Sequence, residues 1–272
     1  MKIALIQFEI ALGQPEENVR RLRVHLAEAK ASGAALALLP ELWSTGYALE
    51  RAAELAADEN GFIFGEISRL AKEFSLFLCG SVLEAAQGHY FNTQILCAPN
   101  GAFITRYRKI HLFGLMNEPE FLSPGTTPVT VHLPMGKVGL AICYDLRFPD
   151  LFRFYALEGA QLILLSAEWP HPRLAHWRSL LIARAIENQA FVAACNTVGQ
   201  GNGNVFCGHS MIVNPWGEVL VEADETDVVV CAEIDLREAD DIRRRYPFLS
   251  DAKPIPTPQL VSETAASLRN VD

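Results

Sequence analysis

Apolar residues recur along the chain in short runs that alternate with amphipathic segments. The apolar run 2–8 is followed by an amphipathic segment over 15–32 and, after Gly33, by a second apolar run over 34–39. Runs of this length predict strands, whereas apolar positions spaced three and four apart predict a helix. The first part of the chain is therefore predicted to fold as strand, helix and strand.

The same order returns in the middle of the chain, with a strand over 137–142, a helix over 149–157 and a strand over 161–165. The two units begin with KIALIQ and KVGLAIC and close with GAALALLPELW and GAQLILLSAEW. Each crossover must place its helix on the outer face of its own sheet, so the repeat favours one pseudo-symmetric domain with two sheets. The alternative is that any two such units look alike, because short apolar runs are weakly specific.

The remaining pattern continues an α/β order and then becomes rich in strands. Helices are predicted over 62–74 and 173–189, strands over 76–83, 91–98, 102–108, 191–196, 209–213, 219–223 and 228–234, and a hairpin turn over 214–217. Pro254, Pro256 and Pro258 interrupt the end of the chain. We therefore expect a single domain over 1–250 and a proline-containing tail over 251–272 without regular structure.

Charge narrows the range of partners. The 272 residues carry a formal net charge of −9, which argues against nucleic acid or an anionic membrane surface as a partner. The basic run 243–245 is interpreted as a solvated helix face. No stretch reaches the roughly 20 apolar residues that a membrane-spanning helix needs, and Gln7 and Glu9 interrupt the only apolar run near the N-terminus.

The cysteines point to a reducing compartment. Six are scattered without the spacing of metal ligands, and several lie in apolar runs, as buried free thiols do. We therefore expect a cytoplasmic protein whose cysteines bind no metal. His171, His176 and His209 form no recognisable pair with a cysteine, which disfavours a papain-type dyad.

Two residues with chemical potential follow strands of the repeated unit. Glu41 comes just after the run 34–39, and Cys143 comes directly after 137–142. Open α/β folds gather ligands at the carboxyl ends of strands. A carboxylate that follows buried aliphatic residues is desolvated and becomes a stronger base, and a thiol that leads into a helix is expected to favour the thiolate. Each signal alone is weak, since a strand-end glutamate is usually solvated and most cysteines of this kind are core thiols.

Three separated segments carry a family resemblance. LLPELWSTGY (38–47), YRKIHLF (107–113) and GLAICYDLRFP (139–149) resemble, in this order, the Glu, Lys and Cys motifs of the nitrilase or carbon–nitrogen hydrolase superfamily. The resemblance covers nearly the whole chain. It implies a four-layer α-β-β-α sandwich that frequently forms homodimers, with a catalytic site between the sheets.

The resemblance also implies roles for individual residues. Glu41 would be the general base, Cys143 the nucleophile and Lys109 the stabiliser of the oxyanion, which the backbone N–H of Tyr144 would also bind. A second glutamate would orient the lysine; Glu118 fits the family pattern better than Glu120, which stays possible.

The segments 143–149 and 167–189 resemble the ω-amidase branch, which hydrolyses small ω-amides of dicarboxylates such as 2-oxoglutaramate and succinamate. Tyr47, Trp169 and Arg173 would then contact the substrate, although Trp169 could be an ordinary core aromatic and Arg173 a surface residue. Asp145 and Arg147 are expected to fix the turn around the nucleophile, and Arg184, Glu187 and Asn188 to secure the long helix.

Two other functions stay open at this stage. A relative within the superfamily could act on a nitrile, a carbamoyl amine or another aliphatic amide, because such relatives share the core motifs. A non-catalytic binding protein could keep the fold, although the presence of all three catalytic residue types disfavours it.

Overall fold

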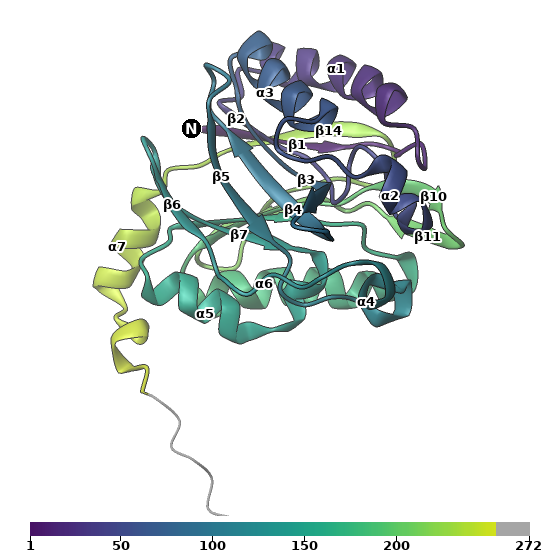
Figure 1. The fold of residues 1–272 in the computed structure, drawn as a ribbon. Coiled ribbons are helices and arrows are strands. Elements are labelled where there is room, and N and C mark those ends of the chain that lie inside the picture. The colour runs from purple at the N-terminus through teal and green to yellow at the C-terminus, as the bar shows by residue number, and fades with distance from the viewer. Residues whose placement is uncertain (254–272) are drawn as a thin grey trace, which may run out of the picture.

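Two six-stranded sheets pack face to face, and helices cover both outer sides (Figure 1). This computed structural model describes residues 1–253. The first sheet has the order β14-β1-β2-β3-β4-β5 and the second β13-β12-β9-β8-β7-β6. Their strands are β1 (Lys2–Gln7), β2 (Leu36–Leu38), β3 (Phe77–Ala86), β4 (His89–Cys97), β5 (Phe103–Arg108), β6 (Thr130–Leu133), β7 (Gly136–Ile142), β8 (Leu162–Ser166), β9 (Phe191–Cys195), β12 (Met211–Val213), β13 (Val219–Glu222) and β14 (Val228–Glu233).

The two sheets repeat one topology, as the resemblance between the two sequence units predicts. In each sheet three parallel strands, β1 to β3 or β7 to β9, are followed by two antiparallel strands. Each half then gives a strand to the other sheet, since β6 pairs with β7 and β14 pairs with β1. The α-β-β-α sandwich is therefore confirmed, and the exchanged edge strands link its two halves.

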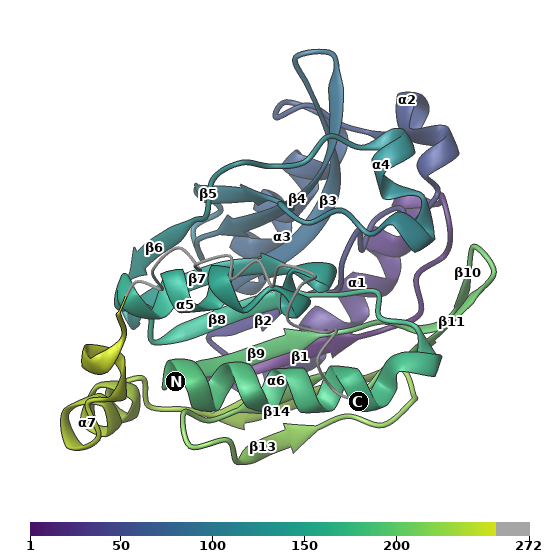
Figure 2. The same cartoon turned by 90° about the horizontal axis from the view of Figure 1, so that it is seen from below.

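Alternation along β1 explains how the layers separate. Ile3 and Leu5 pack in the core between the sheets, whereas Ala4 and Ile6 pack in a second core beneath the outer helices. Those helices are α1 (Pro15–Ala31) and α3 (Phe62–Phe74); on the other side α5 (Pro149–Leu157) and α6 (Leu174–Asn188) lie along the second sheet (Figure 2). Strands apolar on both faces are what a sheet buried on both sides requires.

Some elements differ from the predicted ones. The strand predicted over 34–39 is only Leu36–Leu38, because the chain turns toward the second sheet after Leu39, whose amide still donates to Cys79 of β3. Short elements without a clear apolar period were not predicted: the helices α2 (Ala52–Leu55) and α4 (Glu118–Phe121) and the hairpin β10 (Val198–Gly201) and β11 (Asn204–Cys207). A 3-10 turn, Phe248–Asp251, reaches into the predicted tail, whose residues 254–272 lie outside the described range.

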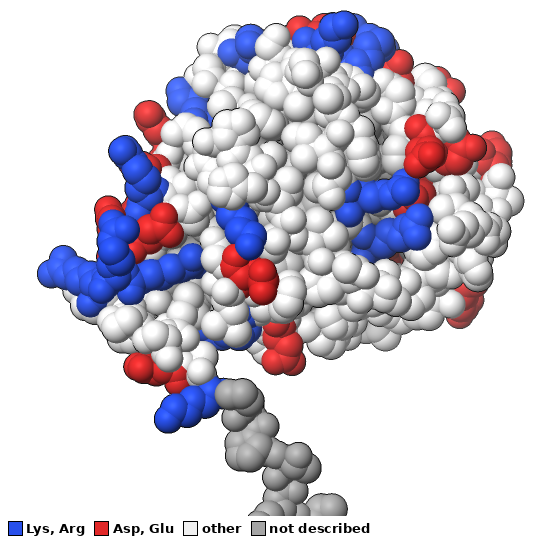
Figure 3. All heavy atoms as spheres, turned by 60° about the vertical axis from the view of Figure 1, so that its left-hand side comes forward, with Lys and Arg blue, Asp and Glu red and all other residues white. Residues whose placement is uncertain are grey.

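The basic run 243–245 lies on the helix α7 (Arg237–Arg245), but its first residue is only partly exposed. Arg243 donates hydrogen bonds to the carbonyl oxygens of Ala160 and Asn188, so it anchors α7 to the second half of the sandwich. Elsewhere, Figure 3 shows basic and acidic side chains next to one another in small groups, so that charge on this face is locally balanced. Within residues 1–253, no helix combines the length and the apolar character needed to cross a membrane.

Candidate active site

Glu41, Lys109 and Glu118 meet between the two sheets. Glu41 follows β2, Lys109 follows β5, and Glu118 begins α4. Their exposed fractions are 0%, 1% and 0%, so the charges are removed from water. The Lys109 Nζ lies 2.7 Å from Glu41 Oε1 and 2.8 Å from Glu118 Oε1. Glu120 is exposed, so the structure places Glu118 beside the lysine.

Tyr47 and Asn92 bind the same two carboxyl groups. The Tyr47 hydroxyl lies 2.9 Å from Glu41 Oε1 and 3.0 Å from Glu118 Oε1, and the Asn92 amide donates to both oxygens. A tyrosine hydroxyl has one hydrogen, so both of its contacts are hydrogen bonds only if one carboxyl group brings a proton of its own. The contacts of Tyr47 therefore indicate one proton shared within the cluster.

The pKa shifts of the charged groups in this cluster are consistent with one retained proton. Burial alone would lower the pKa of Lys109, but the charges of Glu118 and Glu41 outweigh it and raise the pKa, which keeps the ammonium charged. Burial raises the pKa of Glu118, and the Glu41 charge adds to this effect. One buried cation can neutralise one carboxylate, so the two glutamates together are expected to retain one proton.

Cys143 lies at the carboxyl end of β7, in a left-handed backbone conformation with φ 44° that a residue with a side chain seldom adopts. Asp145 fixes this turn: its carboxylate accepts hydrogen bonds from the Ile142 amide at 2.9 Å and the Tyr107 hydroxyl at 2.7 Å. Arg184 of α6 donates to the Leu146 carbonyl oxygen. The expected roles of Asp145 and Arg184 agree with these contacts.

The Cys143 thiol differs from the expectation of a favoured thiolate. Burial raises its pKa well above the ordinary value, and the Glu41 charge raises it further. Only 4% of the residue is exposed, and its Sγ lies 3.9 Å from the carbonyl oxygen of Glu168. The amide groups of the following turn do not offset these effects. The resting thiol is protonated, so attack requires a base.

A narrow cleft opens over Cys143. Its volume is about 10 Å³, room for roughly one water molecule. It is lined by Phe113, Cys143, Tyr144, Arg147, Glu168, Trp169, Pro170 and Arg173. Tyr47 is not among these residues, because its hydroxyl is bound to the two buried glutamates; its expected contact with the substrate is replaced by a place inside the cluster.

Two arginines flank the cleft without an acidic partner among residues 1–253. Arg147 lies over the Trp169 ring at 4.8 Å from its centroid, and Arg173 lies over the Phe113 ring at 5.4 Å. Arg147 was expected to fix the nucleophile turn, but its hydrogen bond goes to His176 on α6. Cationic groups on aromatic walls above a thiol suit a small substrate that carries a carboxylate.

The sequence matches a known family of enzymes. The carbon–nitrogen hydrolase family matches residues 2–244. The chain belongs to the carbon–nitrogen hydrolase family. The resemblance to the nitrilase superfamily is thereby confirmed across almost the whole described chain.

Relatives of known activity lie in the branch that the sequence resembles. The chain is 42% identical to 2-oxoglutaramate amidase of Bacillus subtilis (strain 168), over 92% of this chain and 97% of that one. It is 36% identical to omega-amidase NIT2 of Homo sapiens, over 90% and 92%. A crystal structure of a CN-hydrolase superfamily protein from Xanthomonas campestris, with an arsenic adduct in its active site, superposes with a TM-score of 0.88 at 31% identity, over 95% of this chain and 99% of that one.

The sequence analysis missed two residues of this carbon–nitrogen hydrolase site, Asn92 and Glu168, and expected a different role for a third, Arg147. Asn92 lies within a strand, and its contact with Glu41 bridges 51 positions, which no local pattern reveals. Arg147 belongs to a recognised motif, but its direction depends on the fold. Glu168 could have been found from the repeat, because in the alignment of GAALALLPELW with GAQLILLSAEW it stands one position beyond the counterpart of Glu41.

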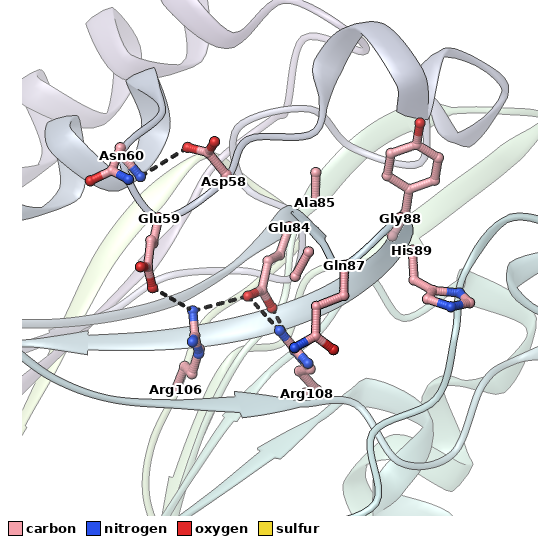
Figure 4. Close-up of a pocket in the computed structure, with 12 residues that line it drawn as sticks. Asp58, Glu59, Asn60, Glu84, Ala85, Gln87, Gly88, His89, Arg106 and Arg108 are labelled. Atoms are coloured by element: carbon pink, nitrogen blue, oxygen red, sulfur yellow. Dashed lines mark hydrogen bonds and ion pairs between the residues drawn. The ribbon is translucent and has the colours of Figure 1, made fainter.

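A larger hollow lies away from this site. Its volume is about 640 Å³, and it surrounds Glu84, which is 1% exposed (Figure 4). The Glu84 carboxylate accepts hydrogen bonds from Arg108 at 2.8 Å, Arg106 at 3.0 Å and Thr93 at 2.6 Å, and Arg106 also reaches Glu59. Every one of these charges has a partner, and no cysteine, serine or threonine lines the hollow. We interpret it as a structural ion cluster.

Proposed function

We propose that this carbon–nitrogen hydrolase cleaves the amide bond of small ω-amides of dicarboxylates, with 2-oxoglutaramate and succinamate as substrates. The observation that carries the proposal is the buried cluster of Glu41, Lys109 and Cys143 beneath two arginines that have no acidic partner among the described residues. The activities named for the Bacillus and human relatives support the same substrate class.

In the first half-reaction, Glu41 takes the proton of the Cys143 thiol and the sulfur attacks the amide carbonyl carbon. The carbonyl oxygen becomes negatively charged in the tetrahedral intermediate. The Lys109 ammonium and the backbone N–H of Tyr144 stabilise that oxygen, and losing one such donor raises a barrier by about 3–4 kcal/mol. Protonated Glu41 then gives its proton to the leaving nitrogen, so that ammonia departs and a thioester remains.

In the second half-reaction, the vacated position admits a water molecule. Glu41 accepts a proton from this water as its oxygen attacks the thioester, and the same proton returns to the sulfur as the carboxylic acid is released. Glu118 keeps the Lys109 ammonium in place through a hydrogen bond of 2.8 Å, and Asn92 and Tyr47 hold the two carboxyl groups together. Neither half-reaction calls for a metal or an organic cofactor.

The distal carboxylate of the substrate would be recognised at the mouth of the cleft. Arg173 and Arg147 supply the positive charge, and Trp169 and Tyr144 form walls between them and the thiol. The indole N–H of Trp169 donates to the Arg173 carbonyl oxygen at 2.9 Å, which fixes the start of the helix that carries Arg173. Because the closed cleft has room for about one water molecule, an amide can enter only if these mouth residues shift.

A homodimer in the cytoplasm is the state that we propose for the protein. Large apolar side chains are exposed on the outer helices of the second sheet: Phe154 at 43% and Leu157 at 58% on α5, and Ile186 at 51% on α6. A second copy packed there would bury them and extend the sandwich. The cysteines of residues 1–253 are free thiols, which suits a reducing compartment. Light scattering of the purified protein tests the dimer.

The test of the proposed function is ammonia release across a substrate panel. We expect turnover of 2-oxoglutaramate and succinamate, and little with glutamine, a carbamoyl amino acid or an aliphatic nitrile. Turnover of the nitrile or the carbamoyl compound alone would assign the protein to another reaction of the family. Release of no ammonia from any of them would favour a binding protein that keeps the fold.

A further inference from the structure

Glu168 is a buried carboxyl group that the reaction described above does not use. It lies two residues beyond the end of β8, and only 2% of it is exposed. Its main chain is part of the site: the amide N–H donates to Glu41 Oε2 at 2.9 Å, and the carbonyl oxygen faces the Cys143 sulfur. These contacts fix the backbone of Glu168, so its side chain starts from a fixed position beside Cys143.

The carboxyl group of Glu168 lacks a partner for one of its oxygens. Among residues 1–253, no donor or acceptor reaches the buried Oε1. A β-carbon placed on Gly46 would lie 3.8 Å from this oxygen and near the side chains of Ile10 and Leu12, so these surroundings are mainly apolar. Buried polar groups nearly always have a hydrogen-bond partner, so an exception in a residue that lines the cleft calls for a ligand that supplies one.

The charge state of Glu168 determines what such a ligand must offer. Burial raises the pKa of Glu168 well above its ordinary value, and the Glu41 charge adds to this effect. The nearby cation, Lys109, is already bound by Glu41 and Glu118. A neutral carboxylic acid has one O–H donor, so it pairs with an uncharged acceptor such as a carbonyl oxygen.

We propose that Glu168 is a specificity-determining residue whose carboxyl O–H donates a hydrogen bond to the 2-oxo oxygen of a 2-oxo ω-amide. The inference rests on the proposed function. In 2-oxoglutaramate the arginines at the cleft mouth bind the carboxylate, and Cys143 attacks the amide carbon. The oxo oxygen between these two ends is the remaining polar atom, and the buried Glu168 lines the same cleft as Cys143 and Arg173.

The test compares two substrates that differ in this oxygen alone. Glutaramate has the same chain as 2-oxoglutaramate, with a methylene group in place of the oxo group. The ratio of their kcat/KM values isolates the contribution of the oxo oxygen. We expect the wild type to prefer 2-oxoglutaramate, Glu168→Leu to lower the ratio at least about tenfold, and Glu168→Gln, which keeps an N–H donor, to retain most of it.

A control and a spectroscopic measurement separate the possible outcomes. Tyr90→Phe removes a hydroxyl outside the cleft, at the hollow around Glu84, and should leave the ratio unchanged. An equal loss on both substrates in Glu168→Leu, or an unchanged ratio, overturns the proposal. If the wild type hydrolyses neither substrate, the proposed function has failed instead.

Should Glu168→Leu not fold, isotope-edited infrared spectra of 2-oxoglutaramate bound to Cys143→Ala give a second readout. We expect the stretching frequency of the oxo group to lie below its value in water. A frequency above that value would show that the site provides no strong donor.

Discussion

Two ion clusters lie on opposite faces of the same pair of strands. Asn92 and Lys109 face the second sheet and bind Glu41 and Glu118, whereas their neighbours Thr93 and Arg108 bind Glu84 on the other face. Successive residues of a strand point to opposite sides, so one short stretch of β4 and β5 supplies both clusters. The backbone hydrogen bond from Lys109 to Asn92, at 2.9 Å, joins them.

The clusters differ in charge balance more than in size. Around Glu84, two half-exposed guanidinium groups neutralise a buried carboxylate beside a hollow of about 640 Å³. Around Lys109, a single ammonium faces the carboxyl groups of Glu41, Glu118 and Glu168 next to a cleft of about 10 Å³. More buried carboxyl groups than cations can exist in one cluster only if some of the carboxyl groups stay protonated. Such groups can donate and accept protons during a reaction. The excess of buried acids therefore identifies the reactive site, whereas the volume of the neighbouring cavity would point to the Glu84 cluster instead.

Removing the nucleophile should have the largest effect. Cys143→Ala is expected to lower kcat for succinamate by roughly 10⁶-fold, because the thioester can no longer form. The matched control is Cys79→Ala, which removes another buried thiol from the core between the sheets and should lose some stability while turnover persists. Ammonia release together with thermal melting checks both variants. Substantial turnover by Cys143→Ala would contradict a thioester mechanism.

Removing the single cation of the cluster, Lys109, should have the next largest effect. Lys109→Met removes an oxyanion donor and leaves the acids without a cation, so we expect kcat to fall by about 10²–10³-fold. Lys137→Met, at a partly exposed lysine on β7, should retain activity. Steady-state kinetics of the two variants measure the difference. A Lys109→Met enzyme with near-normal kcat would place the oxyanion elsewhere.

The mouth arginines should affect the choice of substrate more than turnover. Arg173→Ala and Arg147→Ala are each expected to lower kcat/KM for succinamate by about 10–100-fold, the scale of one charge-assisted hydrogen bond, with little change for butyramide. Arg178→Ala, on the exposed side of α6 where it pairs with Glu222, is the control. If both amides lose equally, these arginines do not bind the carboxylate.

The Glu84 cluster should affect stability and hardly affect turnover. Glu84→Gln is expected to cost about 2–3 kcal/mol of the free energy of unfolding, because the charge partner of two arginines is lost, while kcat changes less than a few-fold. Burial alone would raise the pKa of Glu84, but its hydrogen bonds with Arg108 and Thr93 outweigh it and lower the pKa.

The sign of the pH dependence follows from that lowered pKa. Because the folded value lies below the unfolded one, the stabilisation is complete above the unfolded pKa and is lost as the pH falls through the folded one. The stability gap between wild type and Glu84→Gln should therefore be present at neutral pH and shrink in acid. Urea unfolding at both pH values measures it, and a gap that widens in acid would contradict the assignment.

The sequence predicted those features that follow from the repeated strand–helix–strand unit or from residues that are near one another along the chain. The repeated unit predicts the two sheets and places Glu41 and Cys143 at strand ends. Lys109 and the preference for Glu118 came from the family resemblance. The place of Tyr47 inside the cluster and the direction of Arg147 toward the cleft depend on segments that only the folded chain brings together. The protonated thiol was missed because its burial is a property of the tertiary structure.

The most direct test of the central claim is to trap the covalent intermediate. Enzyme mixed with succinamate and quenched in acid during turnover should show, by intact-protein mass spectrometry, a mass gain equal to one succinyl group. Peptide mapping should place that group on Cys143, and Glu41→Gln enzyme should form far less of it. Ammonia release without any adduct, or an adduct on one of the other five cysteines, would contradict the account.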